Sequence, residues 1–244
     1  MPAPIEDPAP DLASRLDLLD WGALDAALDA QGWAIAPQLL RAAEADAIAA
    51  LYPRAAGFRS HVVMDRHGFG RGEYKYFSNP LPSIIGALRC AAYPHLARLA
   101  NRWAERLGET VRFPPDHAAF LARCHAAGQT RPTPLLLSYG AGDYNCLHRD
   151  LYGAHVFPLQ IAILLDQPGE DFTGGEFVIT EQRPRRQSRA MVLPLNKGDG
   201  AIFAVHHRPV KGARGEYRAR LNHGVSALHA GRRRTLGVIF HDSA

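Results

Sequence analysis

The sequence predicts an α+β protein in which N-terminal helices support a double-stranded β-helix, or jelly-roll, core. Apolar residues recur at helical spacing in the first half of the chain, and the composition changes after Pro134. Beyond that point, short runs of β-branched and aliphatic residues alternate with Gly, Pro and Asp, which is typical of many-stranded proteins. These runs number about eight, as a jelly roll requires for its two sheets.

The chain of 244 residues is expected to form one large domain, because β-rich domains of this length commonly stay single. Residues 1–10 contain four prolines and no apolar period, which indicates a flexible tail. Residues 11–244 then form the domain, with mostly helical support over 11–134 and the jelly-roll core over 135–244.

Spacing and composition assign four elements in the first half: a helix over 12–28, a strand over 32–37, a helix over 39–51 and helical structure over 84–107. Pro94 lies inside the last of these. Because proline lacks the amide donor that a helix interior uses, it predicts two helices there rather than one. The stretch 57–83 is expected to be rich in loops.

In the second half, β-rich runs bounded by turn residues predict strands near 135–139, 144–150, 157–165, 175–181, 190–195, 200–205, 221–228 and 232–240. Helices packed against one of the two sheets would complete the layers of the domain.

Bulk composition excludes several classes of protein. With 47% hydrophobic and 21% charged residues, the chain is globular rather than disordered. It has no apolar run long enough to span a bilayer, and its start, MPAPIEDPAP, lacks the regions of a secretory signal. Three widely spaced cysteines do not form a disulfide framework, so a cytoplasmic location is expected.

Charge is distributed unevenly along the chain. Residues 1–50 hold nine acids and two arginines, a net charge of −7, whereas residues 183–234 hold thirteen Lys/Arg against two acids, a net charge of +11. This asymmetry suggests an anionic partner such as nucleic acid. The alternative is a solvated basic face that the acidic N-terminal segment neutralises, and charge alone does not decide between them.

One short motif carries the ligands for a metal ion. His148 and Asp150 lie two residues apart on a predicted strand, so both side chains leave the same face. His223, 73 positions after Asp150, is the best third ligand. Two histidines and one carboxylate around an ion with open positions opposite is the arrangement of non-haem Fe(II) oxygenases. An ordinary hydrogen-bonded pair in the core is the alternative explanation of His-x-Asp.

Other histidines are weaker candidates as ligands, since none has a partner at suitable spacing: His155, His206, His207 and His241. His206 and His207 are adjacent and would face opposite sides of a strand.

Arg233 is the candidate anion-binding residue. The segment 229–231 suits a three-residue hairpin loop ending in a left-handed Gly231, and the resulting register places Gly237 opposite His223. A dicarboxylate bound to the metal at one end would then meet the guanidinium of Arg233, whose planar fork suits a carboxylate. The alternative is that Arg232, Arg233 and Arg234 merely solvate a turn, as is expected of the outer two.

These motifs resemble, in the right order, the signature of the 2-oxoglutarate/Fe(II) dioxygenase superfamily: His148-x-Asp150, then His223, then Gly231-x-Arg233-x-Thr235-Leu236. Residues 173–177 and 197–203 resemble its central strands. More narrowly, residues 70–242 resemble a bacterial family of oxygenases predicted to act on damaged nucleic acid, through GQTRPTPLLL, HRDLYG and FTGGEFVITEQRP.

The resemblance implies an enzyme that uses Fe(II), with 2-oxoglutarate and dioxygen as co-substrates. It gives residues 135–244 the role of catalytic core and Arg233 the role of binding 2-oxoglutarate. A polar residue at the position of Tyr139 often bonds the co-substrate in the superfamily, and Thr235 would assist Arg233. A core aromatic and a strand filler are the ordinary explanations of these two residues.

The substrate is left open by the sequence. Arg233 follows His223 by ten positions, a spacing closer to prolyl-hydroxylase-like relatives than to AlkB-type DNA demethylases. The alternatives are oxidation of alkylated, single-stranded nucleic acid, hydroxylation of a protein side chain or small metabolite, and a non-catalytic jelly-roll binding module. RGEYKYF (71–77) combines cations and aromatics suited to a stacked base, and the basic stretch 183–220 begins with a solvated hairpin tip.

Overall fold

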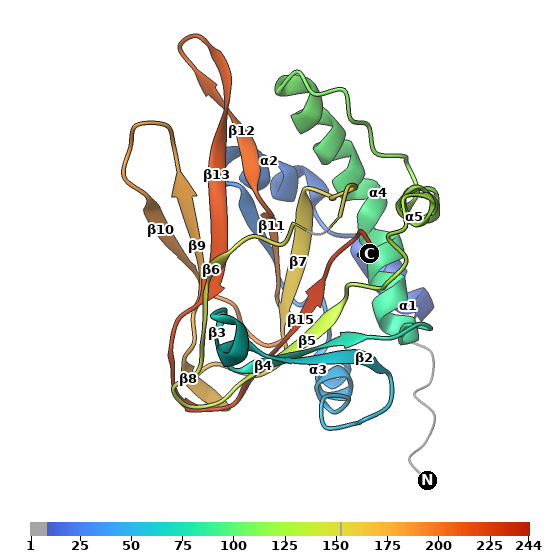
Figure 1. The fold of residues 1–244 in the computed structure, drawn as a ribbon, viewed down its shortest axis with the longest axis vertical. Coiled ribbons are helices and arrows are strands. Elements are labelled where there is room, and N and C mark those ends of the chain that lie inside the picture. The colour runs from blue at the N-terminus through green and yellow to red at the C-terminus, as the bar shows by residue number, and fades with distance from the viewer. Residues whose placement is uncertain (1–8, 152) are drawn as a thin grey trace.

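Two antiparallel sheets facing each other form the centre of the protein in the computed structural model, which describes residues 9–151 and 153–244 (Figure 1). The seven-stranded sheet has the order β1 (Trp33–Ala36), β11 (Gly200–Ala204), β7 (Leu159–Leu164), β15 (Arg233–Val238), β5 (Leu135–Tyr139), β4 (Glu73–Phe77) and β2 (Phe58–Val63).

The six-stranded sheet contains β10 (Arg189–Leu193), β9 (Phe177–Gln182), β13 (Gly215–Val225), β6 (Tyr144–His148) and β3 (Gly70–Arg71), and β12 (His207–Gly212) pairs with the first half of β13. A short pair, β14 (Leu228–Gly231) and β8 (Phe172–Gly174), lies apart from both sheets. Phe177 of β9 meets Phe203 of β11 across the interior, with ring centroids 5.2 Å apart. The predicted α+β fold with a jelly-roll core is confirmed.

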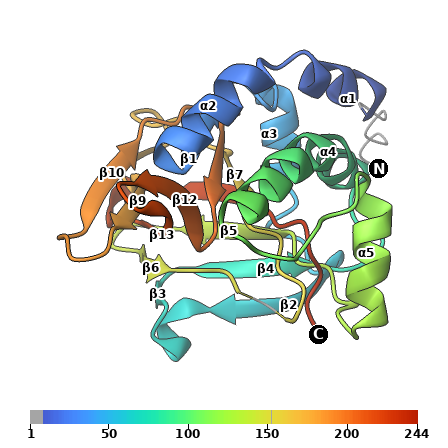
Figure 2. The ribbon, with the colours of Figure 1, turned by 90° about the horizontal axis from the view of Figure 1, so that it is seen from above.

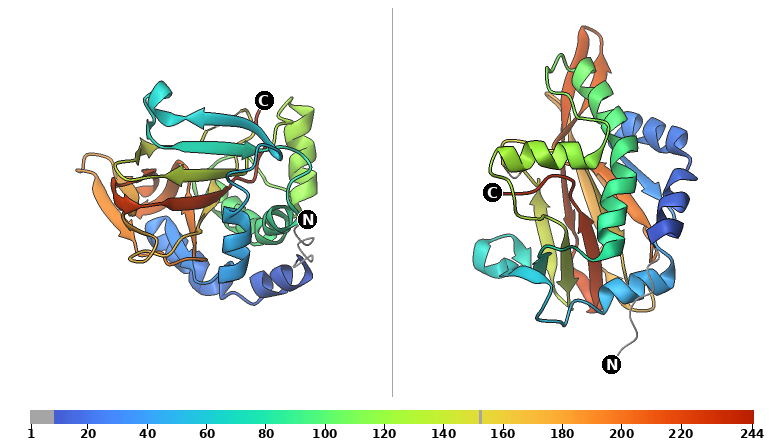
Figure 3. Two further views of the ribbon diagram at one scale, coloured as in Figure 1. Left: turned by 90° about the horizontal axis from the view of Figure 1, so that it is seen from below. Right: turned by 90° about the vertical axis from the view of Figure 1, so that its right-hand side faces the viewer.

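The helices gather on the outer side of the seven-stranded sheet, as the views from above and from the side show (Figures 2 and 3). They are α1 (Ala9–Asp17), α2 (Trp21–Gln31), α3 (Ala42–Ala49), α4 (Ser83–Arg106) and α5 (His117–Ala126). None of the described helices combines the length and apolar character that crossing a bilayer requires.

The single helix predicted over 12–28 is wrong in one respect, because the structure divides it into α1 and α2. Asp20 lies at the break and its carboxylate accepts a hydrogen bond from the amide of Ala23, 2.9 Å away. Such a bond satisfies one of the amide donors left free at a helix start, so Asp20 begins a new helix.

The prediction that Pro94 separates two helices is wrong. Helix α4 runs without interruption from Ser83 to Arg106, with Pro94 inside it. Its buried face repeats at helical spacing on both sides of the proline, through Ile85, Leu88, Ala92, Leu96, Leu99 and Trp103. A proline costs a helix interior about 3 kcal/mol. Each large apolar side chain that α4 buries contributes about 1.5–3 kcal/mol, so packing outweighs the lost hydrogen bond.

The stretch 57–83 is not mainly loop, because β2, β3 and β4 form within it. Most side chains of β2 are partly buried, so the sequence lacks the alternation that marks a strand with one buried face. The strands form because β4 pairs with β5 of the core and β2 then pairs with β4. Three further elements were not predicted: helix α5 and strands β8 and β12.

The hairpin predicted at 229–231 is also wrong. Strands β13 and β15 belong to different sheets, β13 pairing with β6 and β9, and β15 with β5 and β7. The residues between them form β14 instead, which pairs with β8. Gly231 does adopt the expected left-handed conformation, with φ +83°. It is held there by contact with β8 rather than by a tight turn.

Substitution of Gly231 by Ala is expected to destabilise the protein more than the same change at Gly169. Both glycines have φ +83°, so both alanines are strained, at about 1–3 kcal/mol each. A Cβ at Gly231 would also lie 2.8 Å from Cα of Phe172 and overlap the carbonyl of Asp171, whereas Gly169 has open space. The overlap adds about 1–3 kcal/mol, measurable by urea unfolding. An equal loss of unfolding free energy in the two variants would contradict the close packing of Gly231 against β8.

Candidate metal centre and its cavity

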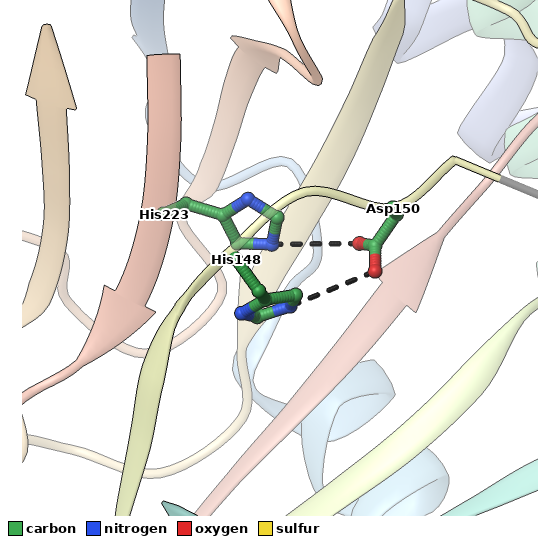
Figure 4. A group of neighbouring side chains, drawn as sticks. All are labelled: His148, Asp150 and His223. Atoms are coloured by element: carbon green, nitrogen blue, oxygen red, sulfur yellow. Dashed lines mark ion pairs between the residues drawn. The ribbon is translucent and has the colours of Figure 1, made fainter. Parts of the chain in front are cut away.

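Two neighbouring strands of the six-stranded sheet and the segment after one of them carry the three predicted metal ligands. His148 is the last residue of β6 and pairs directly with His223 of β13. Asp150 lies two residues beyond the strand, which ends earlier than the predicted 144–150. The three side chains point toward one another (Figure 4).

The ligand atoms are close enough to share one ion. Nε2 of His148 lies 3.6 Å from Oδ1 of Asp150, and Nε2 of His223 lies 3.4 Å from Oδ2. All three ligand atoms lie within 4.8 Å of one another, and the described residues contain no other cluster of this kind. His155, His206, His207 and His241 are therefore outside it, as the sequence had indicated.

Hydrogen bonds hold these ligands in orientations that suit a metal. Nδ1 of His148 lies 2.8 Å from the carbonyl of Cys146, to which it donates, so Nε2 is left with its lone pair toward the cluster. The amide of Gln160, on β7, donates to Oδ2 of Asp150 at 2.9 Å and lies 3.5 Å from Nε2 of His223. Gln160 thus connects the two sheets at the cluster.

The protonation states also suit a cation. Burial raises the pKa of Asp150, but the hydrogen bond and charge of His223, the charge of His148 and the bond from Gln160 outweigh it and hold the pKa well below its usual range. Burial, followed by the charge of His223, lowers the pKa of His148. At neutral pH Asp150 is therefore a carboxylate, and His148 is a neutral imidazole with a free lone pair.

The cluster opens into a cavity of about 450 Å³ between the two sheets. Its walls are largely apolar and aromatic and include Tyr74, Tyr76, Leu137, Phe177, Phe203 and Val225. The ring of Phe203 packs 4.7 Å from that of His223. Such walls exclude water and strengthen electrostatic interactions within the cavity.

Arg233 lines the same cavity and is only 1% exposed. Its Nη1 donates to Oγ1 of Thr235 at 2.6 Å, while its Nε has no hydrogen-bond partner in the part of the chain that the structure describes. No carboxylate in the described residues pairs with it. Burial lowers the pKa of Arg233, opposed by Tyr139, Asp166 and Glu176. A buried cation without a counterion is costly unless an anion binds to it.

Tyr139 lies beside this guanidinium, because Arg233 pairs with Tyr139 across β15 and β5. The guanidinium carbon is 5.7 Å from the centre of the Tyr139 ring, and the hydroxyl accepts a hydrogen bond of 3.3 Å from Asn145. Burial raises the pKa of Tyr139 to about 12, so the phenol stays protonated and retains a donor. Tyr139, Thr235 and Arg233 therefore lie together, as predicted, in the wall of the cavity.

The neighbouring arginines have different environments. Arg232 is exposed, in agreement with its predicted role at the surface. Arg234 does not merely solvate a turn, because it forms an ion pair with buried Asp166 and donates to the carbonyl of Ala49. This pair joins β15 to the chain that follows β7.

The segment 71–77 contributes only part of what was expected. Tyr74 and Tyr76 line the cavity, but Lys75 points away from it, donating to the carbonyl of Tyr52 at 2.9 Å and lying over the Tyr52 ring. Gln160 is the functional residue that the sequence analysis missed. A single polar residue inside the apolar strand LQIAIL was the available signal, since buried amides need a partner.

Comparison with known proteins identifies the family. The model of a family described as an oxygenase catalysing oxidative methylation of damaged DNA matches residues 72–243. This chain belongs to that oxygenase family. The match covers both sheets from β4 onward, including all three candidate ligands and Arg233.

Two proteins of Mycobacterium tuberculosis, described as uncharacterized proteins MT2286 and Rv2227, are each 47% identical to this oxygenase over 168 residues, covering 69% of this chain and 72% of theirs. A Pseudomonas putida prolyl-4-hydroxylase is 15% identical, with a TM-score of 0.53 over 92% of this chain and 99% of that one.

A 2OG-Fe(II) oxygenase family protein from Burkholderia pseudomallei is 16% identical, with a TM-score of 0.53 over 93% of this chain and 94% of that one. At such identities these two structures establish the fold. Together with the family match, they confirm the predicted membership in the 2-oxoglutarate/Fe(II) oxygenase superfamily.

Proposed function

We propose that the oxygenase holds Fe(II) with His148, Asp150 and His223 and binds 2-oxoglutarate with Arg233. The observation that carries this proposal is the buried Arg233, which has no counterion among the described residues and lines the same cavity as the three ligands. A dicarboxylate is complementary to both, with one end at the metal and the other at the guanidinium.

The residues fit both groups. Two imidazoles and one carboxylate on one side of the cavity form the ligand set that suits non-haem Fe(II) and leaves positions open. When bound, iron would supply the activation of dioxygen, coupled to oxidative decarboxylation of 2-oxoglutarate to succinate and CO2. Arg233 and Thr235 orient the far carboxylate, and the phenol of Tyr139 offers it a further donor.

The chain contributes mainly geometry and the exclusion of water. Gln160 orients the carboxylate of Asp150, and Phe177 and Phe203 cover the ring of His223. Removal of water from the cavity protects a reactive centre from side reactions. Tyr74 and Tyr76 line the cavity in which the substrate carbon is to be oxidised.

For the substrate, we propose an alkylated base in single-stranded DNA, in line with the damaged DNA in the description of the family. The cavity volume of about 450 Å³ accommodates a base that has left its stack, and its aromatic walls suit a flat ring. Hydroxylation of an N-methyl group on such a base releases formaldehyde and restores the unmethylated nitrogen.

The test supplies the protein with Fe(II), 2-oxoglutarate and methylated oligonucleotides, and measures succinate and formaldehyde. The His148→Ala variant is the control for reaction without the enzyme. Formaldehyde formed in step with succinate supports the DNA substrate. Succinate formed only with amino acids, peptides or metabolites assigns the alternative hydroxylase function, and a chain that forms no succinate with or without substrate is a binding module.

Replacement of Gln160 by Leu is expected to weaken metal binding by about 10–100-fold, as is usual when a residue that orients a metal ligand is removed. Leucine keeps the size but loses the bond to Asp150. Calorimetric titration with Co(II) measures the affinity, and Gln187→Leu, at an exposed loop position, is the control. An unchanged affinity would mean that Asp150 needs no support from β7.

A further inference from the structure

A basic groove lies on the outer face of the six-stranded sheet, between the long hairpins β9–β10 and β12–β13 that project at the top left of Figure 1. It encloses about 510 Å³, and its cationic or titratable side chains are Arg183, Arg185, Arg218, Arg220, His206 and His207. Arg218 and Arg220 leave the outer face of β13, while the alternate residues Ala219, Leu221 and His223 are buried on its inner face.

Part of the charge of the groove is free. Arg183 pairs with Glu181, and Arg218 with Glu109. Arg185 and Arg220 have no carboxylate partner in the described part of the chain. Among the described acidic residues of the first 50, none forms an ion pair with an arginine of the groove: Asp25 and Asp29 pair with arginines of α4, and Asp46 pairs with Lys197, which lies outside the groove. At the groove, an anionic partner is therefore favoured over neutralisation by the acidic N-terminal segment.

The groove and the metal centre lie on opposite faces of the sheet, near a break in the pairing of β13 that we call the notch. Strand β13 changes its neighbour at Leu221, since β6 pairs with residues 223–225 and β12 with residues 215–220. β6 ends at His148, and the amide of Leu221 donates to the carbonyl of His206, just before β12. The outer end of the notch is thus next to Arg220, and its inner end next to the ligands.

Arg149 directly follows β6 and so lies beside the notch. It lies between His148 and Asp150 in the chain, is exposed, and lines the rim of the metal cavity. It has no ion-pair partner among the described residues. Burial lowers the pKa of His206, and the charges of His207, Arg149, Arg220 and Arg218 lower it further, so the three arginines lie near His206. Free cations therefore continue from the groove to the cavity.

We infer that the backbone of single-stranded DNA binds along Arg185, Arg220 and Arg149, and that the strand passes the notch to place one base in the metal cavity. This inference rests on the proposed function and adds the route by which the strand reaches the site. Arg220 is three residues from His223 on β13, or about 10 Å along the strand, so a phosphate at Arg220 lies within a few nucleotides of the metal.

A single strand fits the route better than a duplex. The backbone of a single strand bends freely and presents unpaired bases, so one base can leave the groove and enter a cavity beside it. Guanidinium groups bind phosphates through two parallel hydrogen bonds. Arg220 is held on the paired strand β13, and Arg185 lies in the turn between β9 and β10. The exposed ring of Phe69, at the rim of the same cavity, offers a stacking surface to a neighbouring base.

The experiment measures binding of a fluorescein-labelled oligothymidine by anisotropy at several salt concentrations. The variants are Arg185→Glu/Arg220→Glu, Arg185→Lys/Arg220→Lys and Arg54→Glu, in the full chain. Arg54 is an exposed arginine between α3 and β2, elements at the opposite end of the molecule from the hairpins (Figure 1), and its reversal changes the net charge by half as much as the double variant does.

Reversal of both groove charges is expected to lower affinity by at least about tenfold and to reduce the slope of log affinity against log salt by about 1.4, the share of two phosphate contacts. The lysine pair should keep the slope, and Arg54→Glu should bind as the unmodified protein does. The inference is overturned if the charge-reversed groove variant keeps the affinity and slope of the unmodified protein, or if Arg54→Glu weakens binding equally.

The turnover assay separates this inference from the proposed function. If the unmodified protein oxidises methylated oligonucleotides and the charge-reversed groove binds them equally well, the route is wrong and the function stands. If the unmodified protein neither binds nor oxidises DNA, both the route and the DNA substrate are wrong.

Discussion

Alanine at His148 or at Asp150 abolishes turnover, lowering kcat by more than about 1000-fold, because loss of a ligand removes the metal contribution of several kcal/mol. Both residues contribute a ligand atom to the only such cluster in the described residues. The fold should survive, since neither side chain packs in the apolar core. Calorimetry with Co(II) should show that metal binding is lost together with activity.

The control for this prediction is His155→Ala, which changes a histidine of the same connecting segment that lies outside the cluster. It should keep both metal binding and turnover. If His148→Ala or Asp150→Ala retains tight metal binding, the ion is held elsewhere. In that case the assignment of all three ligands fails, whatever happens to activity.

Alanine at Arg233 weakens 2-oxoglutarate binding by about 2–5 kcal/mol, or roughly 30–5000-fold in Kd, because it leaves a buried carboxylate without its charged partner. Lysine at the same position recovers only part of the loss, since a point charge cannot form the two parallel bonds of the guanidinium. Titration of the metal-loaded protein with 2-oxoglutarate measures both effects.

Arg232→Ala is the matched control, because Arg232 is the adjacent arginine in the chain and is exposed. Its 2-oxoglutarate affinity should equal that of the unmodified protein. An Arg233→Ala variant with unchanged affinity would show that a different cation binds the far carboxylate. Metal affinity, measured separately, distinguishes that outcome from damage to the whole cavity.

The sequence by itself determined the fold class and the three side chains that meet. His-x-Asp near the end of a strand and a later strand with His223 predicted the three ligands, because side chains two positions apart on a strand leave the same face. In the structure His148 pairs with His223 and Asp150 lies just beyond β6. The order of the motifs along the chain then indicated the oxygenase superfamily and the role of each residue. Arg233 was also found from the sequence, since its position in the motif does not depend on the partners of its strand.

Only the tertiary structure decided which strands pair and what encloses the cavity. His223 and Arg233 face the same cavity across two sheets, and not across a hairpin as the local turn signal had indicated. Turn residues indicate only the local conformation of the chain. Gly231 has the predicted left-handed conformation, but this conformation is compatible with more than one partner strand. The partners of β15 are β5 and β7, strands far from it in the sequence, and packing of the two sheets selects them.

The same reason explains the other differences. Helix α4 continues through Pro94 because its buried face packs on both sides of the proline. Strands β4 and β2 form because β4 pairs with the edge of β5, and β2 then pairs with β4. Gln160 reaches Asp150 from the opposite sheet, a contact that no spacing in the sequence encodes. The periodicity of apolar residues indicates which face of a helix or strand is buried. The element that covers this face depends on contacts between residues far apart in the chain.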